Sequence, residues 1–136
     1  MKKKEVIFYD GNAFRSTSNT LELKAGNKGS VSGMGYMQEI QLTERKIKNF
    51  WKKMDEIDVW HWEKNYSIGE ICDGHMWKLY IRNKEGKAKV VNGHSEYPHH
   101  FDELIKALNN LFGSKIETIE DLNTENEVIE ISTSYY

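Results

Sequence analysis

Residues 76–82 alternate between large apolar and more polar side chains. Because successive side chains of a strand point to opposite faces, this pattern predicts a strand with one buried face. The buried positions are Trp77, Leu79 and Ile81. Residues 83–86, Asn-Lys-Glu-Gly, are typical of a tight turn, and residues 87–92 return as a partner strand. The pattern therefore predicts a β-hairpin.

A helix is predicted directly after this hairpin. Pro98 fits the first helical position, where its missing N–H costs nothing. Gly113 fits the position just past the helix end. Between them, apolar residues recur at helical spacing, at Phe101, Leu104, Ile105, Leu108, Leu111 and Phe112. This spacing predicts a helix with one buried face.

A second helix is predicted earlier in the chain, after Thr43, whose side chain suits an N-cap. Its apolar stripe is formed by Ile47, Phe50, Trp51, Met54 and Ile57. Three further strands are predicted, at residues 5–9, 21–24 and 36–42. A turn is expected at 10–12, and a mobile loop rich in glycine and serine at 30–35. Short connections between the strands favour an antiparallel meander.

Two helices with one apolar stripe each, and strands with one apolar face, pack most economically as two layers. We therefore predict an α+β fold, an antiparallel β-sheet with two amphipathic helices packed on one face. The length of 136 residues fits a single domain over residues 1–136. Residues 114–136 are expected to form an acidic C-terminal extension, since they carry one basic and six acidic residues.

Residues 73–104 carry two linked patterns, DG-x-x-W-x-L-x-I from Asp73 to Ile81 and G-x-x-x-YP-x-x-F-x-x-L from Gly93 to Leu104. Together they resemble a signature shared by small uncharacterised bacterial domains of unknown function. The resemblance implies an α+β fold and a bacterial source. It implies no activity.

Composition excludes several classes of protein. The net charge is −2 and 29% of residues are charged, without a clustered basic face, so we expect no nucleic-acid partner. No apolar run is long enough for a membrane span, so no membrane partner is expected. The single cysteine, Cys72, excludes an intrachain disulfide and fits a cytoplasmic protein. We expect no cofactor.

One candidate site is a metal centre. Cys72 and His75 have the C-x-x-H spacing of half a zinc site. The predicted hairpin brings His94 to the same end of the paired strands as His75. No second C-x-x-C or H-x-x-x-H completes the motif. The competing interpretation is that these are ordinary loop and helix-start residues.

The aromatic residues supply a second candidate. Trp60 and Trp62 lie two positions apart in a polar stretch, so they share a face if the chain is extended there. Exposed tryptophan beside mixed charge is typical of protein interfaces. The interface candidate consists of Trp60, Trp62 and Tyr66. The alternative is that these rings cap the edge of the core.

From these observations we expect a non-enzymatic protein-binding or interaction module of bacterial origin, such as an immunity or inhibitor protein. The alternative is a metal-binding protein or metal-assisted hydrolase that uses Cys72, His75 and His94. The sequence leaves open which protein is the partner and what the oligomeric state is.

Overall fold

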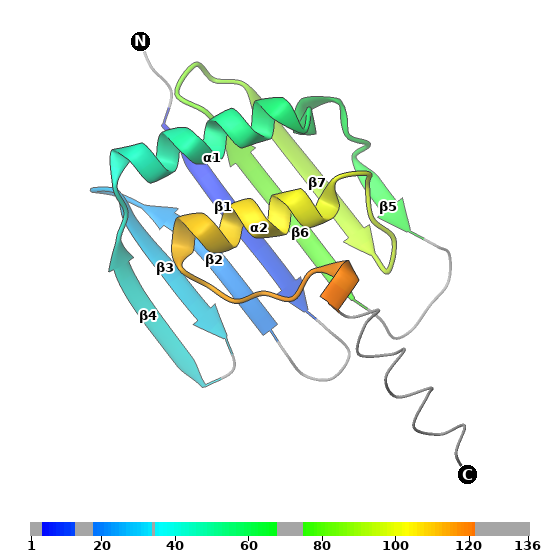
Figure 1. The fold of residues 1–136 in the computed structure, drawn as a ribbon, viewed down its shortest axis with the longest axis horizontal. Helices are drawn as coiled ribbons and strands as arrows, with labels where there is room; N and C mark the ends of the chain where they lie inside the picture. Colours follow the sequence, from blue (N-terminus) through cyan, green and yellow to red (C-terminus); the bar gives the residue numbers. More distant parts are fainter. Residues whose placement is uncertain (1–3, 13–17, 34, 68–74, 122–136) are drawn as a thin grey trace.

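The computed structural model describes residues 4–12, 18–33, 35–67 and 75–121. Its strands are β1 (Val6–Asn12), β2 (Ser18–Lys24), β3 (Lys28–Gly33), β4 (Tyr36–Gln41), β5 (Asn65–Ser67), β6 (Met76–Arg82) and β7 (Ala88–His94). The helices are α1 (Glu44–Glu56), the single 3₁₀ turn η1 (Val59–His61) and α2 (Phe101–Phe112). This arrangement confirms the predicted α+β fold (Figure 1).

The strands form one sheet in the order β4-β3-β2-β1-β6-β7-β5. Neighbouring strands pair antiparallel, except that β5 runs parallel to β7 at one edge. Strands β1 to β4 form an antiparallel meander joined by short connections, with one strand, β3, more than the three predicted. The β6–β7 hairpin pairs with the free side of β1, so the first strand lies in the middle of the sheet.

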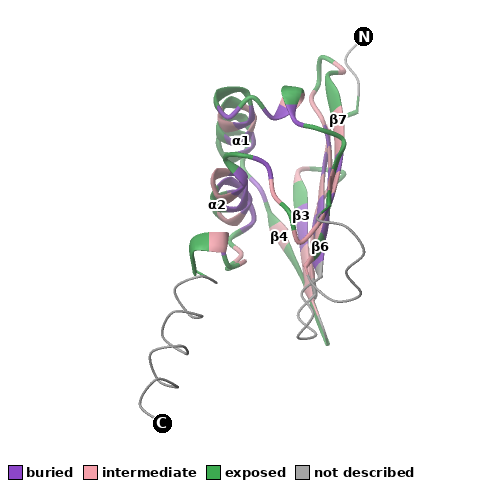
Figure 2. Ribbon diagram, turned by 90° about the vertical axis from the view of Figure 1, so that its right-hand side faces the viewer, coloured by how far each residue is buried: buried purple, intermediate pink, exposed green. Residues whose placement is uncertain are grey.

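The protein has two layers, with α1 and α2 on the same side of the sheet (Figure 2). Alternation along β6 agrees with this arrangement. Trp77, Leu79 and Ile81 are buried, whereas Met76 and Lys78 are exposed. In the described part of the chain, no helix is long and apolar enough to span a membrane.

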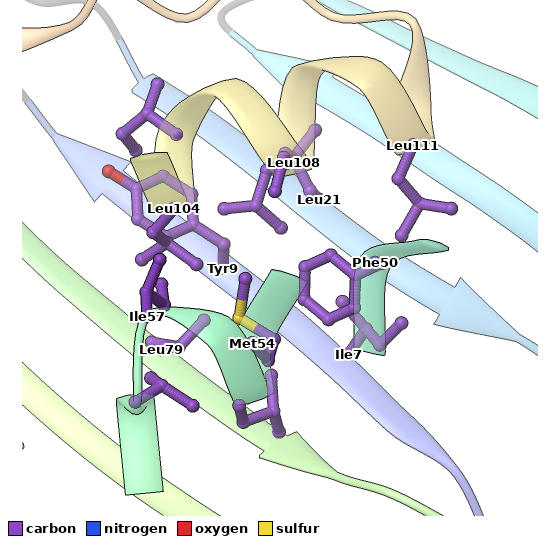
Figure 3. Packing of buried hydrophobic residues seen from close by; sticks show 14 of the residues in the cluster. Ile7, Tyr9, Leu21, Phe50, Met54, Ile57, Leu79, Leu104, Leu108 and Leu111 are labelled. Carbon is purple, nitrogen blue, oxygen red and sulfur yellow. The ribbon is translucent and has the colours of Figure 1, made fainter. Parts of the chain in front are cut away.

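The core fills the space between the helices and the sheet (Figure 3). Strands β1, β2 and β6 contribute the buried residues Ile7, Tyr9, Leu21 and Leu79. The helices cover them with Phe50, Met54, Leu104, Leu108 and Leu111. Every apolar position predicted for α2 is buried, because a 3.6-residue period places all of them on one helix face.

Helix α1 begins as predicted. The Thr43 hydroxyl accepts a hydrogen bond from the Lys46 amide at 3.2 Å, which satisfies one of the free N–H groups of the first turn. Four of its five predicted stripe residues are buried, and the fifth, Trp51, is half-buried.

Helix α2 begins at Phe101, not at Pro98 as predicted. His100, directly before the helix, has a φ of 69°, in the left-handed region. The chain therefore turns between Pro98 and Phe101, and the Phe101 amide donates to the Pro98 carbonyl at 3.1 Å. The other end is as predicted, because Gly113 has a φ of 69° and ends the helix.

Two predicted irregular segments are strands instead. The expected turn at 10–12 continues β1 and pairs on both sides, with Asp10 opposite Thr20 and Lys78. Residues 30–33 of the expected loop complete β3, between β2 and β4. Close packing requires a small residue at Gly29 of β3. A Cβ atom there would lie 3.0 Å from the Phe112 ring.

The first part of the predicted C-terminal extension, residues 114–121, packs against α2. The Asn109 side chain donates to the Ile116 carbonyl and accepts from the Ile116 amide, both at 2.9 Å. Asp102 accepts a hydrogen bond from the Ile119 amide at 2.7 Å. Ile116 and Ile119 are partly buried against the core. Residues 114–121 are therefore part of the packed structure, and the rest of the extension lies outside the described residues.

Candidate functional site

We call the side of the sheet opposite the two helices the open face, because no helix of the described chain lies on it (Figure 2). Alternation assigns to it every second residue of each strand. Its central residues, in β1, β6 and β7, are Val6, Phe8, Asp10, Met76, Lys78, Tyr80, Arg82, Ala88, Val90, Asn92 and His94.

A row of apolar side chains crosses the middle of the open face. Phe8 lies opposite Tyr80, and Tyr80 lies opposite Val90 on the next strand. All three are half-buried. Side chains directly opposite each other in an antiparallel pair are in contact range, so the three form one continuous apolar strip. The free side of an antiparallel sheet is commonly polar, which makes this strip unusual.

Polar groups border the strip on both sides. The next row contains Asp10, Lys78 and Asn92, and Thr20 donates a hydrogen bond to Asp10 at 3.1 Å. On the other side, Arg82 lies between Val6 and Ala88 and donates a hydrogen bond to the backbone carbonyl of Lys4, which precedes β1. An apolar centre with a polar rim of both charges is the usual arrangement of a protein-binding surface.

The predicted tryptophan face does not form. Residues 59–61 adopt a 3₁₀ turn instead of an extended strand, so Trp60 and Trp62 do not share a side. Trp62 is only 8% exposed and belongs to the core. Trp60 is half-buried, and its ring stacks on that of Trp51 with centroids 6.2 Å apart.

The Trp51–Trp60 pair is bound within the chain. The Trp60 indole N–H donates to Asp55 at 2.8 Å, and the Trp51 indole N–H donates to Glu5. The Lys87 ammonium lies 4.9 Å from the centroid of the Trp60 ring. A pocket of about 370 Å³ opens beside Trp51, lined by carboxylates and lysines. Because both indole N–H groups already have partners, we assign these two rings a mainly structural role.

Tyr66, the third residue of the interface candidate, is half-buried on β5. Its ring stacks on Trp77 with centroids 6.3 Å apart, and its hydroxyl accepts a hydrogen bond from the Glu63 amide at 2.8 Å. Tyr97 stacks on Trp77 as well. Burial, followed by the charge of Asp102, raises the pKa of Tyr97. These rings belong to an aromatic cluster on the helix side of the sheet.

His75 and His94 reach the same end of the sheet, as predicted, but not the same face. His94 lies opposite Met76, and both belong to the open face. The His75 ring contacts Tyr97 on the helix side, where its Nδ1 lies 2.9 Å from the Tyr97 hydroxyl. Cys72 lies outside the described residues. In residues 4–12, 18–33, 35–67 and 75–121, no group of three potential ligands is placed to hold a metal ion.

His75 should make the fold sensitive to acid. Burial lowers the pKa of His75 below its ordinary value of 6.5. As the pH falls through 6.5, the unfolded chain takes up this proton before the folded chain does, so the free energy of unfolding decreases. Urea unfolding at a pH of about 7.5 and of about 5.5 should show a smaller decrease for His75→Asn than for the wild type. Equal decreases would contradict a role for His75.

Sequence reasoning did not single out Phe8, Tyr80 and Val90 as site residues. The sequence did contain one signal. In the alternating run of residues 76–82, the aromatic residue Tyr80 occupies a position that the pattern assigns to the solvent-facing side of the strand. Its neighbours on the same face, however, belong to strands distant in sequence. Only the register of β1, β6 and β7 joins these side chains into one strip.

Comparisons with protein-family models, with curated proteins and with solved structures gave no match to this chain. The resemblance of residues 73–104 to a bacterial signature therefore stays a prediction. The structure does account for part of that pattern. Trp77 and Phe101 are core residues, and Gly93 leaves room for the Trp77 ring.

Proposed function

We propose that this protein is a non-enzymatic binding module that uses its open face to bind another protein. The observation that carries the proposal is the Phe8–Tyr80–Val90 strip on the side of the sheet away from the helices. A contiguous apolar patch rimmed by polar residues is a common mark of a protein interaction site. Aromatic residues are also enriched among the side chains that dominate binding energy.

The chemistry of the surface limits the kind of partner. The rim of the strip carries both charges, since Asp10 lies opposite Lys78, Glu22 lies opposite Phe8, and Arg82 lies opposite Val6. Such a rim favours a folded protein with an apolar patch and a mixed rim of its own over a highly charged polymer. A bacterial immunity or inhibitor protein acting in the cytoplasm is the form of this proposal that fits the sequence.

The test compares three forms of the purified chain as bait in extracts of the native host. Tyr80→Glu places a charge in the middle of the strip, and Lys52→Glu is a control on the exposed side of α1. A protein retained by the wild type and by Lys52→Glu should bind Tyr80→Glu at least about 30-fold more weakly, equivalent to about 2 kcal/mol. Titration calorimetry with the purified partner measures this difference.

Circular dichroism and thermal unfolding must show that Tyr80→Glu is folded, which we expect because Tyr80 is only half-buried. A second variant, Val90→Lys, tests the same strip from the neighbouring strand. If the partner binds both folded variants as tightly as the wild type, the open face is not the binding surface. If all forms bind nothing, the proposed function is wrong.

A further inference from the structure

The two edges of the sheet differ in how they are protected. At one edge, β5 is only three residues long. At the other edge, β4 has six residues and pairs with β3 on one side only. An edge strand presents a row of unpaired N–H and C=O groups, which makes it a template for another strand. In the described chain, β4 is the longer of these two templates.

Strand β4 lacks the usual features that prevent strand addition. It contains no proline and no lysine, and its pairing with β3 runs from Tyr36 to Gln41 without a bulge. Tyr36 is 54% exposed and Met37 is 74% exposed. The only charged residue is Glu39, whose carboxylate lies 3.7 Å from the Lys28 ammonium on β3. This charge is therefore already partly balanced within the chain.

We propose that β4 pairs antiparallel with β4 of a second copy of this chain, around a two-fold axis at Gln38. Residues opposite each other in an antiparallel pair lie on the same face of the sheet. Because side chains alternate between the two faces, a two-fold axis midway between two residues would place side chains of opposite faces against each other. The axis must therefore pass at one residue, which lies opposite itself, and both copies then place their helices on the same side of the joined sheet. With the axis at Gln38, Tyr36 lies opposite Ile40 and Met37 lies opposite Glu39.

Side-chain pairing favours this register over its neighbours. An aromatic ring opposite a β-branched residue, as for Tyr36 and Ile40, is a favourable cross-strand pair. An axis one residue later places the two Glu39 carboxylates opposite each other, which is unfavourable. An axis one residue earlier pairs fewer residues of β4. Both the charge and the length of the strand therefore select Gln38.

The dimer joins the two sheets edge to edge and makes the two open faces one continuous surface. The proposal does not depend on the Phe8–Tyr80–Val90 strip, because β4 lies three strands away from β1. A single pair of strands forms a small interface, so we expect the dimer to have a dissociation constant on the order of micromolar. Sedimentation velocity over a concentration series should show a monomer that becomes a dimer.

Engineered cysteines test the register. In a background with Cys72→Ser, Gln38→Cys should form a disulfide-linked dimer on mild oxidation, because the two residues face each other across the axis. Met37→Cys and Glu39→Cys should each stay uncrosslinked alone and crosslink when the two proteins are mixed. Lys52→Cys, on the exposed side of α1, is the control and should not crosslink.

Met37→Pro removes an N–H from the free edge of β4, because the pairing of β3 with β4 turns the N–H groups of Met37 and Glu39 outward. This variant should abolish the dimer while the Phe8–Tyr80–Val90 strip still binds its partner. A wild-type chain that stays monomeric at every concentration overturns the proposal and leaves the edge to a strand of a different protein. Self-crosslinking by Met37→Cys or Glu39→Cys overturns the register. A dimer that crosslinks at none of these positions lies elsewhere and overturns the proposal too.

Discussion

Replacing Trp77 with alanine should lower the free energy of unfolding by about 3–5 kcal/mol. The indole is 3% exposed and lies 4.7 Å from the Phe101 ring, measured between centroids. It stacks on Tyr66 and Tyr97 at 6.3 Å each, and its N–H donates to the Glu96 carbonyl at 3.2 Å. Alanine leaves a cavity among three rings, and rings close such a space only in part.

The matched control is Met76→Ala. Met76 is adjacent in sequence, but its side chain is 58% exposed on the opposite face of the sheet. We expect this change to alter stability by less than about 0.5 kcal/mol. Urea unfolding followed by circular dichroism measures both variants. Equal effects of the two substitutions would mean that the aromatic cluster does not stabilise the fold as the contacts indicate.

Adding a methyl group at Gly93 should be almost as damaging as removing Trp77. A Cβ atom at Gly93 would lie 2.0 Å from Nε1 and 2.1 Å from Cε2 of Trp77, far inside van der Waals contact. Trp77 cannot move away easily, because the rings of Tyr66, Tyr97 and Phe101 surround it. We expect Gly93→Ala to cost about 3 kcal/mol, at the upper end for an overpacked core.

A double-mutant cycle separates this steric cause from a general weakness of β7. If the clash with Trp77 is the reason, Gly93→Ala should cost much less in a Trp77→Ala background, because the new methyl group enters the vacated space. The double variant is then more stable than the sum of the two single effects predicts. Strict additivity in urea unfolding of the four proteins would contradict the close approach of Gly93 and Trp77.

These two predictions concern the region where sequence reasoning was most accurate. The alternation of residues 76–82 and the spacing of the apolar residues in α2 each distinguish one buried face from one exposed face. A strand or helix with one buried face carries that distinction in its own sequence. The pairing of β6 with β7 also follows locally, because a turn at 83–86 leaves the two strands no other neighbour so close along the chain.

Sequence reasoning failed where the identity of a residue reflects a distant neighbour. The glycine and serine residues of β3 resemble a loop, yet Gly29 is small because Phe112, far along the chain, packs against it. Trp60 and Trp62 would share a face if the segment were extended, yet the 3₁₀ turn at 59–61 sends Trp62 into the core. Neither contact can be inferred from the conformational preferences of the neighbouring residues in the sequence.

The candidate site shows the same division. Sequence placed Tyr80 on the polar side of its strand, and sequence placed His75 and His94 at one end of the hairpin. The order of the strands then decided that Phe8 lies beside Tyr80, and the face of each strand decided that the two histidines are separated by the sheet. A shift of one residue in register moves every side chain to the opposite face.

By itself, the sequence determined the fold class, the hairpin, the two helices and the buried face of each, because periodicity is a property of neighbouring residues. Tertiary structure alone decided that β6 pairs with β1 and that Trp62 is buried while Trp60 stacks on Trp51. It also decided which side of the sheet the helices leave uncovered. These outcomes depend on pairing between segments far apart in the chain, and no local pattern specifies which segments meet.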